Sequence, residues 1–322
     1  MLISHRSLYN LTIGAAGLTQ GFWRNTFSRM VLSWLPPGFL PTHIPYQRYI
    51  PALSRSSIKS RHKELFNIPA SEADIAYFHG CSSDIFTEPI ADSFINIALH
   101  NDWKVSLPPQ RCCGEPFAAI GNIEEYRRLA KYNIDQLWSY RYIVAHCPSC
   151  ILAFEEYAKD FERIKDTAYE KKARDIVTKL YNPAQFIMKV IGPNNLRLGN
   201  NKTKQKVGIH VSCHEKLGYK MAASTNYTSD LLNLIPGLEI VDMRGADECC
   251  GQGGPWGLMN HYDLSVKMRQ GKIANIINSE ANVVTSWCLG CMIQFKDGLG
   301  EAGSSIRVRH PLELLNDTFN TV

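Results

Sequence analysis

The first 63 residues of the chain contain no aspartate or glutamate, although they hold eight lysine and arginine residues. The whole chain has 35 Lys and Arg against 30 Asp and Glu, so residues 64–322 have 27 basic and 30 acidic residues, a net charge of −3. The positive charge is therefore concentrated at one end. Such a chain is not a generally basic nucleic-acid binder, and we expect no nucleic-acid partner.

Long apolar runs are missing as well. No stretch of about 18 or more uncharged apolar residues occurs, so a membrane-spanning helix is not expected. The first residues, MLISHRSLYNLTIGAAGL, do not show the charged n-region and the small-residue cleavage site that are typical of a signal peptide, and we expect no secretory signal. We therefore expect a cytoplasmic protein, which includes a peripheral position at the inner face of the membrane. In a reducing compartment, cysteines act as metal ligands or redox groups rather than as a disulfide framework.

No cysteine is left outside two copies of one pattern. Each copy has a single cysteine, a Cys-Cys-Gly sequence and a C-x-x-C pair. Between the single cysteine and the vicinal pair lie 30 residues in the first copy and 35 in the second, and between the vicinal pair and the C-x-x-C lie 33 and 37 residues. The first copy consists of Cys81, Cys112, Cys113, Cys147 and Cys150. The second copy consists of Cys213, Cys249, Cys250, Cys288 and Cys291. Equivalent cysteines lie 132 to 141 residues apart, which indicates an internal duplication.

The residues between the cysteines alternate between strand-like and helical patterns in both copies. Strand-like runs lead into the cysteines at 74–79, 103–107 and 142–145 in the first copy, and at 207–211, 238–243 and 283–285 in the second. Helical stretches follow the two Cys-Cys-Gly sequences, at 122–139 and 261–278. We predict an α/β fold of two pseudo-symmetric, Rossmann-like units. The cysteines then lie at the carboxyl ends of the strands, where open α/β sheets bind ligands.

Composition divides the chain into three parts. We expect a basic, proline-rich arm at 1–70, a first unit at 71–200 and a second unit at 201–322, with a connector near 192–206. Apolar spacing predicts short helices over 8–18 and 22–35 of the arm, and five prolines after them favour an extended path. The arm either packs on its own acidic body or docks on a partner subunit or an anionic membrane surface.

Five thiols in one place suit a multi-iron cluster better than a single metal ion. A closed structural zinc site takes four ligands, and the side chains of adjacent cysteines diverge, so both rarely bind one tetrahedral ion. They can instead bind or bridge two neighbouring metals, and thiolate-rich sites favour soft metals and iron–sulfur clusters. We predict that all ten cysteines are ligands of such clusters, and zinc in at least one copy or vicinal disulfides are the alternatives.

The neighbours of the cysteines support this interpretation. Gly114 and Gly251 follow the vicinal pairs and let backbone amides point toward sulfur. Each C-x-x-C lies where a helix is expected to begin, which stabilises a thiolate. His79, His146 and His214 are either ordinary loop or core histidines, or they donate an N–H to sulfur or a proton to a leaving thiolate. No histidine has the regular spacing of a direct ligand, and the sequence singles out no catalytic residue.

At these cysteines the chain resembles the CCG family of cysteine-rich domains, in which a cysteine, a Cys-Cys-Gly and a C-x-x-C follow at intervals of about 30–40 residues. The resemblance extends over about 74–316 and includes all ten cysteines and both glycines. The chain looks most like the catalytic B or D subunit of heterodisulfide reductase. Related subunits include the C subunit of anaerobic glycerol-3-phosphate dehydrogenase and the iron–sulfur subunits of glycolate and lactate oxidation.

The resemblance implies an oxidoreductase subunit of heterodisulfide reductase type. Each five-cysteine motif would hold a noncubane [4Fe-4S] cluster, and a disulfide of a small molecule or a protein would be reduced or formed between the two clusters. The full set of ten cysteines favours this function, because relatives that only relay electrons often lack some of them. The alternative is an electron-transfer subunit that links a flavoprotein dehydrogenase for glycerol 3-phosphate, lactate or glycolate to a quinone. A zinc-stabilised assembly subunit is the third hypothesis.

The ferredoxin motif of many such relatives, C-x-x-C-x-x-C-x-x-x-C-P, does not occur in this sequence. We therefore expect a separate ferredoxin-like (C-type) iron–sulfur subunit as a partner, besides a flavoprotein or a membrane subunit with a quinone site. The other interpretation is that the chain corresponds to the C-terminal part of a fused ancestor. A dinucleotide site is not expected, since Gly251-Gln-Gly-Gly254 belongs to a cysteine loop.

Overall fold

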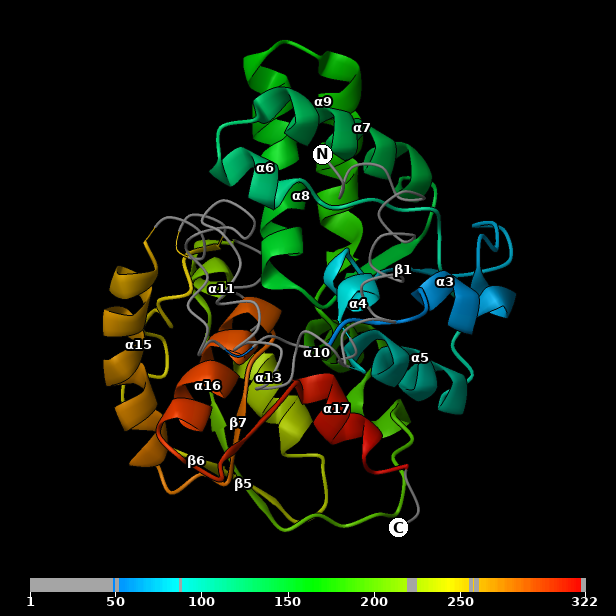
Figure 1. The fold of residues 1–322 in the computed structure, drawn as a ribbon. Coiled ribbons are helices and arrows are strands. Elements are labelled where there is room, and N and C mark those ends of the chain that lie inside the picture. Colours follow the sequence, from blue (N-terminus) through cyan, green and yellow to red (C-terminus); the bar gives the residue numbers. More distant parts are fainter. Residues whose placement is uncertain are drawn as a thin grey trace.

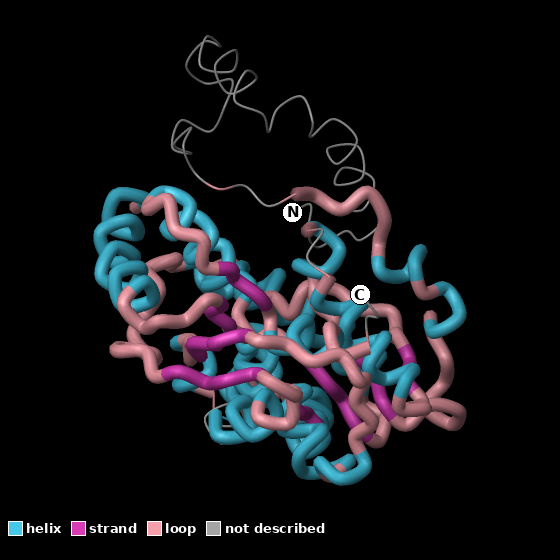
Figure 2. The backbone as a smooth tube through the Cα atoms, turned by 90° about the horizontal axis from the view of Figure 1, so that it is seen from below, coloured by secondary structure: helices cyan, strands magenta, loops and turns pink. Residues whose placement is uncertain are grey.

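Two four-stranded parallel sheets organise the computed structural model, which describes residues 49, 52–86, 89–218, 225–254, 257 and 261–319 (Figure 1). The first half of the sequence forms one sheet and the second half forms the other. Figure 2 shows the two groups of strands in separate parts of the molecule, each accompanied by helices. The α/β fold with two duplicated units that the sequence predicts is confirmed.

The first sheet has the strand order β2-β1-β3-β4. Its strands are β1 (Ile75–Phe78), β2 (Val105–Ser106), β3 (Tyr142–Ala145) and β4 (Leu180–Tyr181). All pairs are parallel, and Ile75 of the central strand pairs with Val105 on one side and Tyr142 on the other. All four residues of β1 are buried, as expected for a strand covered by helices on both faces. The main helices are α5 (Ile90–His100), α7 (Ile123–Leu137), α8 (Pro148–Arg163) and α9 (Thr167–Lys179).

The second sheet repeats this topology in the order β6-β5-β7-β8. Its strands are β5 (Gln205–Ile209), β6 (Leu238–Val241), β7 (Val283–Thr285) and β8 (Arg307–Arg309). Val207 pairs with both Ile240 and Val283, as Ile75 does with its two neighbours. The helices of this unit are α11 (Cys213–Leu217), α13 (Thr225–Leu232), α15 (Tyr262–Ile277), α16 (Leu289–Glu301) and α17 (Pro311–Asn316). The shared strand order is what an internal duplication requires.

The two units meet through equivalent helices. Helix α17 follows the last strand of the second unit and packs on α5 of the first. Helix α10 (Pro183–Phe186) follows the last strand of the first unit and packs on α13 of the second. Because α5 and α13 both follow the first strand of their units, the same contact is made twice. The units are therefore related by an approximate two-fold arrangement.

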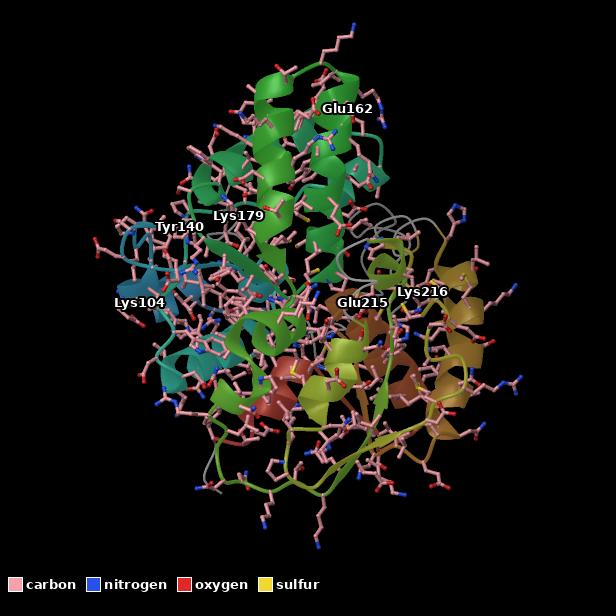
Figure 3. The ribbon with its side chains drawn as sticks, turned by 180° about the vertical axis from the view of Figure 1, so that it is seen from behind. Lys104, Tyr140, Glu162, Lys179, Glu215 and Lys216 are labelled. Atoms are coloured by element: carbon pink, nitrogen blue, oxygen red, sulfur yellow. The ribbon has the colours of Figure 1, made fainter. Side chains whose placement is uncertain are left out.

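A helical hairpin distinguishes the first unit from the second. Helix α9 packs along α8, and Figure 1 shows this hairpin projecting from the body of the molecule. Figure 3 shows Glu162 near its far end. Helix α9 begins where the Asp166 side chain accepts a hydrogen bond from the amide of Tyr169. In the second unit α16 leads to β8 through 302–306, and within this described stretch no helix corresponds to α9.

The described end of the predicted arm packs on the first unit. It forms α3 (Ile58–Arg61) and a short 3₁₀ turn (Lys63–Leu65), and Ile58 is completely buried. Asp92 of α5 accepts hydrogen bonds from Arg61 and His62. Asn67 donates to the carbonyl of Leu107 at 3.0 Å. The helices expected over 8–18 and 22–35 lie outside the described residues.

The sequence patterns located most elements but missed the last strand of each sheet. The expected helix at 122–139 is α7, and the one at 261–278 is α15. Strands β4 and β8 are only two and three residues long, too short for a periodic pattern, and α9 was not expected either. Among the described residues, no helix is long and apolar enough to cross a membrane.

Candidate functional site

The cysteines of each unit lie in three loops at the carboxyl edge of its sheet. In the first unit Cys81 follows β1, the vicinal pair follows β2, and the C-x-x-C follows β3. The second unit has the same arrangement after β5, β6 and β7. Because the central strand lies between the other two, the three loops are neighbours. The strand order therefore brings together five thiols that are spread over about 70 to 80 residues of sequence.

The five thiols of the first unit form a continuous series of contacts. The sulfur of Cys81 lies 3.8 Å from that of Cys112. Cys112 interacts with its neighbour Cys113, which reaches Cys150. Cys150 in turn interacts with Cys147 at the other end of the C-x-x-C. All five predicted residues of this copy are thus brought together.

The second unit reproduces the series in the same order. Cys213 contacts Cys249, which contacts its neighbour Cys250. The sulfur of Cys250 lies 3.2 Å from that of Cys291, and Cys291 interacts with Cys288. All ten cysteines are free thiols. The predicted pairing of two equivalent five-thiol groups is therefore present in the tertiary structure, from residues that the sequence identified.

Each vicinal pair combines one acidic and one weakly acidic thiol. Hydrogen bonds from Cys112 and Cys150 lower the pKa of Cys113 to about 6, although burial opposes the shift. In the second unit the order is reversed: the bond with Cys249 raises the pKa of Cys250 to about 12, while bonds from Cys213 and Cys250 lower the pKa of Cys249. Each vicinal pair thus holds one thiol that ionises readily, and the thiolate is the metal-binding form.

Helix N-termini support the C-x-x-C thiols, as the sequence predicts. Cys147 is the N-cap residue of α8, and Cys288 is the N-cap residue of α16. The thiol of Cys150 lowers the pKa of Cys147, and backbone amides of the first helical turn act in the same direction. The thiol and amide of Cys291 do the same for Cys288. The helix dipole and free amides favour a thiolate at both positions.

The two glycines after the vicinal pairs allow the loops to pack on the following helices. Gly114 has φ +90° and Gly251 has φ +80°, in the region that favours glycine. A Cβ at Gly114 would lie 2.8 Å from Cδ2 of Tyr126, and one at Gly251 would lie 2.8 Å from the carbonyl oxygen of Ser265. The amide of Gly114 donates to the sulfur of Cys112 at 3.5 Å, and the amide of Gly251 donates to Cys249 at 3.4 Å. The glycines therefore serve both packing and sulfur binding.

The three histidines singled out in the sequence have different surroundings. Nδ1 of His79 lies 2.8 Å from the carbonyl oxygen of Gly80. Nδ1 of His146 lies 2.7 Å from the hydroxyl of Tyr77, and burial lowers the pKa of this histidine to about 3. His214 of α11 meets Ser149 of the first unit at 2.7 Å. Figure 3 shows the neighbouring Glu215 and Lys216 on α11, which packs beside α8. His214 thus links the units.

Buried aromatic side chains lie where the two sites approach each other. The charge of Cys288 acts to raise the pKa of Cys147, so the two C-x-x-C loops lie within electrostatic range of each other. His310 packs edge-to-face on His146 at 5.5 Å and on Trp287 at 5.0 Å. Nε2 atoms of both histidines are buried without a hydrogen-bond partner among the described residues. Sequence reasoning missed His310 because it lies 19 residues beyond the last cysteine.

Solvent access differs between the two sites. In the first, Cys112, Cys113 and Cys150 are buried and the other two thiols are half-buried. In the second, Cys213 and Cys249 are exposed. The ligand order is thus shared, but one edge of the second group is open to solvent.

The donor set suits an iron–sulfur cluster better than one metal ion. In the described part of the chain, no three His, Cys, Asp or Glu side chains converge on a position for a single ion. A zinc site surrounds one point with four ligands. Here five thiols follow one another in a series instead, with amides donating to sulfur. Thiolates spread over several irons, with hydrogen bonds to sulfur, are typical of iron–sulfur sites.

Comparisons with known proteins match this arrangement. A family profile described as the CCG cysteine-rich domain matches twice, at residues 75–155 and 207–296, which include all ten cysteines. The chain is 27% identical over 244 residues to lactate utilization protein A 1 of Bacillus mycoides, covering 76% of this chain and 96% of that protein. It is 29% identical over 246 residues to lactate utilization protein A of Anoxybacillus flavithermus, covering 76% and 99%.

A solved structure shares the fold. The crystal structure of a hypothetical protein from Helicobacter pylori superposes with a TM-score of 0.51 at 9% sequence identity. The match covers 82% of this chain and 54% of that one. At this identity the likeness concerns the fold alone.

Proposed function

Since the chain belongs to the CCG cysteine-rich domain family, whose members generally bind iron–sulfur clusters, we propose that it is the electron-transfer iron–sulfur subunit of an oxidoreductase. The proposed role is to carry electrons from a flavoprotein dehydrogenase for lactate or a similar 2-hydroxy acid toward a quinone. The observation that carries the proposal is the similarity to lactate utilization protein A along nearly the whole of that protein. It favours this role over the heterodisulfide reductase expected first from the sequence.

The residues that would hold the clusters are the two five-thiol groups. A bound cluster would supply reversible one-electron chemistry. The protein contributes the ten thiolates, the glycine amides that donate to sulfur and the two helix N-termini that favour ionised thiols. Burial of the inner thiols keeps water away from most of the first site. These contributions stabilise a negatively charged group without any side chain acting as an acid or base.

Anaerobic iron and sulfide analysis with electron paramagnetic resonance tests the cofactor. We expect iron and sulfide for two clusters per chain and a spectrum that appears on reduction. Stoichiometric zinc without iron would contradict the proposal and favour the assembly subunit. Iron in one unit and zinc in the other would leave only half of it standing.

Reconstitution tests the role. A reduced flavoprotein dehydrogenase of the lactate type should reduce the clusters, and a quinone should reoxidise them. Fully loaded protein that accepts no electrons from a reduced flavin donor would contradict the proposed relay.

Disulfide chemistry is the second candidate, and one observation favours it. Both five-thiol groups are complete, and the charge of Cys288 in one group acts on the pKa of Cys147 in the other. A thiol substrate bound to one site under oxidising conditions should produce a new paramagnetic signal. Quinone reduction without any signal on thiol addition supports the relay and argues against disulfide cleavage.

The expected partners include a ferredoxin-like subunit, and the basic arm is proposed as the docking element. Residues 1–48 lie outside the described residues, so this proposal rests on their charge alone. Deleting residues 1–40 should release the protein from its complex and leave iron binding intact. Moderate salt should weaken the same association, because exposed charges are screened beyond about 8–10 Å. Loss of iron on deletion would make the arm structural instead.

A further inference from the structure

A buried lysine of the second unit binds the loop that precedes the vicinal cysteines. The equivalent residue of the first unit carries no charge. Lys272 of α15 is 2% exposed, one of the largest fully buried side chains in the described residues. Its ammonium group donates to the carbonyl oxygens of Gly245 and Ala246, in the loop before Cys249. It thereby ties the cysteine loop to the helix that follows it.

The equivalent position in the first unit is neutral. Asn133 is the eleventh residue of α7, as Lys272 is the eleventh residue of α15. The Asn133 amide donates to the carbonyl of Cys112 at 3.0 Å and accepts from the amide of Arg111 at 2.9 Å. Both side chains therefore hold the same loop to the same helix, but only Lys272 brings a positive charge.

Five of the six buried positions of α7 align with buried positions of α15 and support this equivalence. The aligned pairs are Tyr126 with Ser265, Ala130 with Arg269, Asn133 with Lys272, Ile134 with Ile273, and Leu137 with Ile276. The second helix thus buries two cations where the first buries none.

One of these two cations is neutralised by the protein. Arg269 forms ion pairs with Asp297 and Glu301 of α16. Among the described residues, no ion pair involves Lys272, which meets only carbonyl oxygens. A buried charge without an opposite charge is costly, so its retention points to a negative group nearby.

The negative groups that act on Lys272 are Glu248, in the same loop, and thiols of the second site. Burial lowers the pKa of Lys272, while the charges of Glu248, Cys291 and Cys250 oppose the shift and favour the ammonium form. Thiolates bound to a cluster keep their negative charge permanently. The loaded site would therefore keep Lys272 protonated, and the lysine would in turn act on the cluster.

We propose that Lys272 is a fixed positive charge that makes the iron–sulfur group of the second site the more easily reduced of the two. The inference rests on the proposed function, because both sites must hold iron–sulfur groups. Reduction adds one electron, and a cation at short range in a poorly polarisable site stabilises the added charge. The solvent exposure of Cys213 and Cys249 also affects the reduction potential of this site, because exposure and net charge both determine the potential of a cluster.

A redox titration followed by electron paramagnetic resonance tests the inference on the loaded full-length chain. Wild-type protein should show two reduction steps. In Lys272→Met the ratio of reduced to oxidised second cluster at a fixed potential should fall roughly tenfold, a shift of about 59 mV for one electron. The reduction potential of the first cluster should not change. A Cys150→Ser background, which impairs the first site, identifies the step that moves.

Two matched variants separate charge from packing. Lys272→Arg keeps the charge in a different shape and should leave the potential close to that of wild type. Lys206→Met removes a half-buried lysine of the same unit, which pairs with Glu280 at 3.4 Å, and should shift neither step. Iron content and circular dichroism show whether each variant folds and loads. If Lys272→Met loads poorly, Lys272→Gln is titrated instead.

The outcomes distinguish the inference from the function on which it rests. Two loaded sites whose potentials do not move in Lys272→Met or Lys272→Gln overturn the inference alone. Equal shifts in Lys272→Met and Lys206→Met overturn it as well. A second site that binds no iron in wild-type protein overturns both. In wild type, the gap between the two steps should also persist at high salt, because a buried charge is screened little.

Discussion

Asn133 and Lys272 hold equivalent loops in the two units, yet one is neutral and the other is a cation. The first thiol group is mostly buried and lies beside tyrosines such as Tyr157, whose hydroxyl donates to the carbonyl of Cys113. The second has two exposed thiols. The order of ligands is the same in both because strand topology determines it. The surroundings differ because they depend on the side chains packed behind the loops, which duplication leaves free to change.

Replacing the second cysteine of either vicinal pair by serine is expected to have the largest effect, and the effect is on bound iron. Cys113→Ser and Cys250→Ser should each reduce bound iron to about half of the wild-type content, because each removes a central member of one thiol series and metal binding is coupled to local folding. Iron analysis with thermal unfolding measures this. If either variant lost all of its iron, the two units would not load independently.

Alanine at the glycine after each vicinal pair should destabilise both units similarly. The added Cβ meets a strained φ and contacts of 2.8 Å, so Gly114→Ala and Gly251→Ala should each lower the free energy of unfolding by about 2 kcal/mol. Denaturant unfolding measures the change. Gly121→Ala is a control, since its φ is +80° but its Cβ meets nothing within 4 Å, and it should cost less. An equal cost at Gly121 would mean that backbone strain alone matters.

Alkylation of the reduced, metal-free chain should reveal that thiols of the second site are more accessible to solvent than those of the first. Cys249 should react about tenfold faster than Cys113, because it is exposed and its thiol neighbours favour the thiolate, whereas Cys113 is buried. Peptide mass spectrometry after timed iodoacetamide treatment gives both rates. Urea should abolish the difference. Equal rates in the folded protein would contradict the open edge of the second site.

The smallest expected effect is on the stability with which the described end of the arm, α3 and the turn after it, packs on the first unit. Burial would raise the pKa of Asp92, but hydrogen bonds from His62 and Arg61 outweigh it and lower the pKa far below 3.8. A lowered carboxyl pKa stabilises the fold above about pH 4, and this contribution is lost as the pH falls further. Asp92→Asn should therefore cost about 1 kcal/mol at pH 7, discounted for partial solvent exposure, and little at low pH.

Denaturant unfolding of Asp92→Asn at several pH values checks this. An effect independent of pH would show that shape rather than charge holds the segment. The matched change Asp166→Asn removes the charge that pairs with Lys131 at 2.6 Å but keeps a good N-cap residue for α9, so it should cost less.

Most of the site could be predicted from the sequence, because cysteine spacing is a local and unusual signal. The strands that precede Cys81 and Cys213 and the helices that begin at the two C-x-x-C motifs follow from periodicity and from position next to a glycine or proline. Lys272 could not be identified in the same way. Its side chain lies on a helix with mixed polar and apolar residues, and periodicity does not show which lysine of such a helix is buried.

The sequence by itself determined the duplication, the α/β class and the ten thiols, since these depend on residue type and on spacing along the chain. Only the tertiary structure decided that the thiols follow one another in the same order in both units, because this depends on strand β1 lying between β2 and β3, and β5 between β6 and β7. It also decided that His146, Trp287 and His310 meet between the sites. Such contacts join residues up to 164 positions apart in the sequence. Which of these residues meet, and how deeply they are buried, depends on tertiary packing rather than on the local sequence pattern.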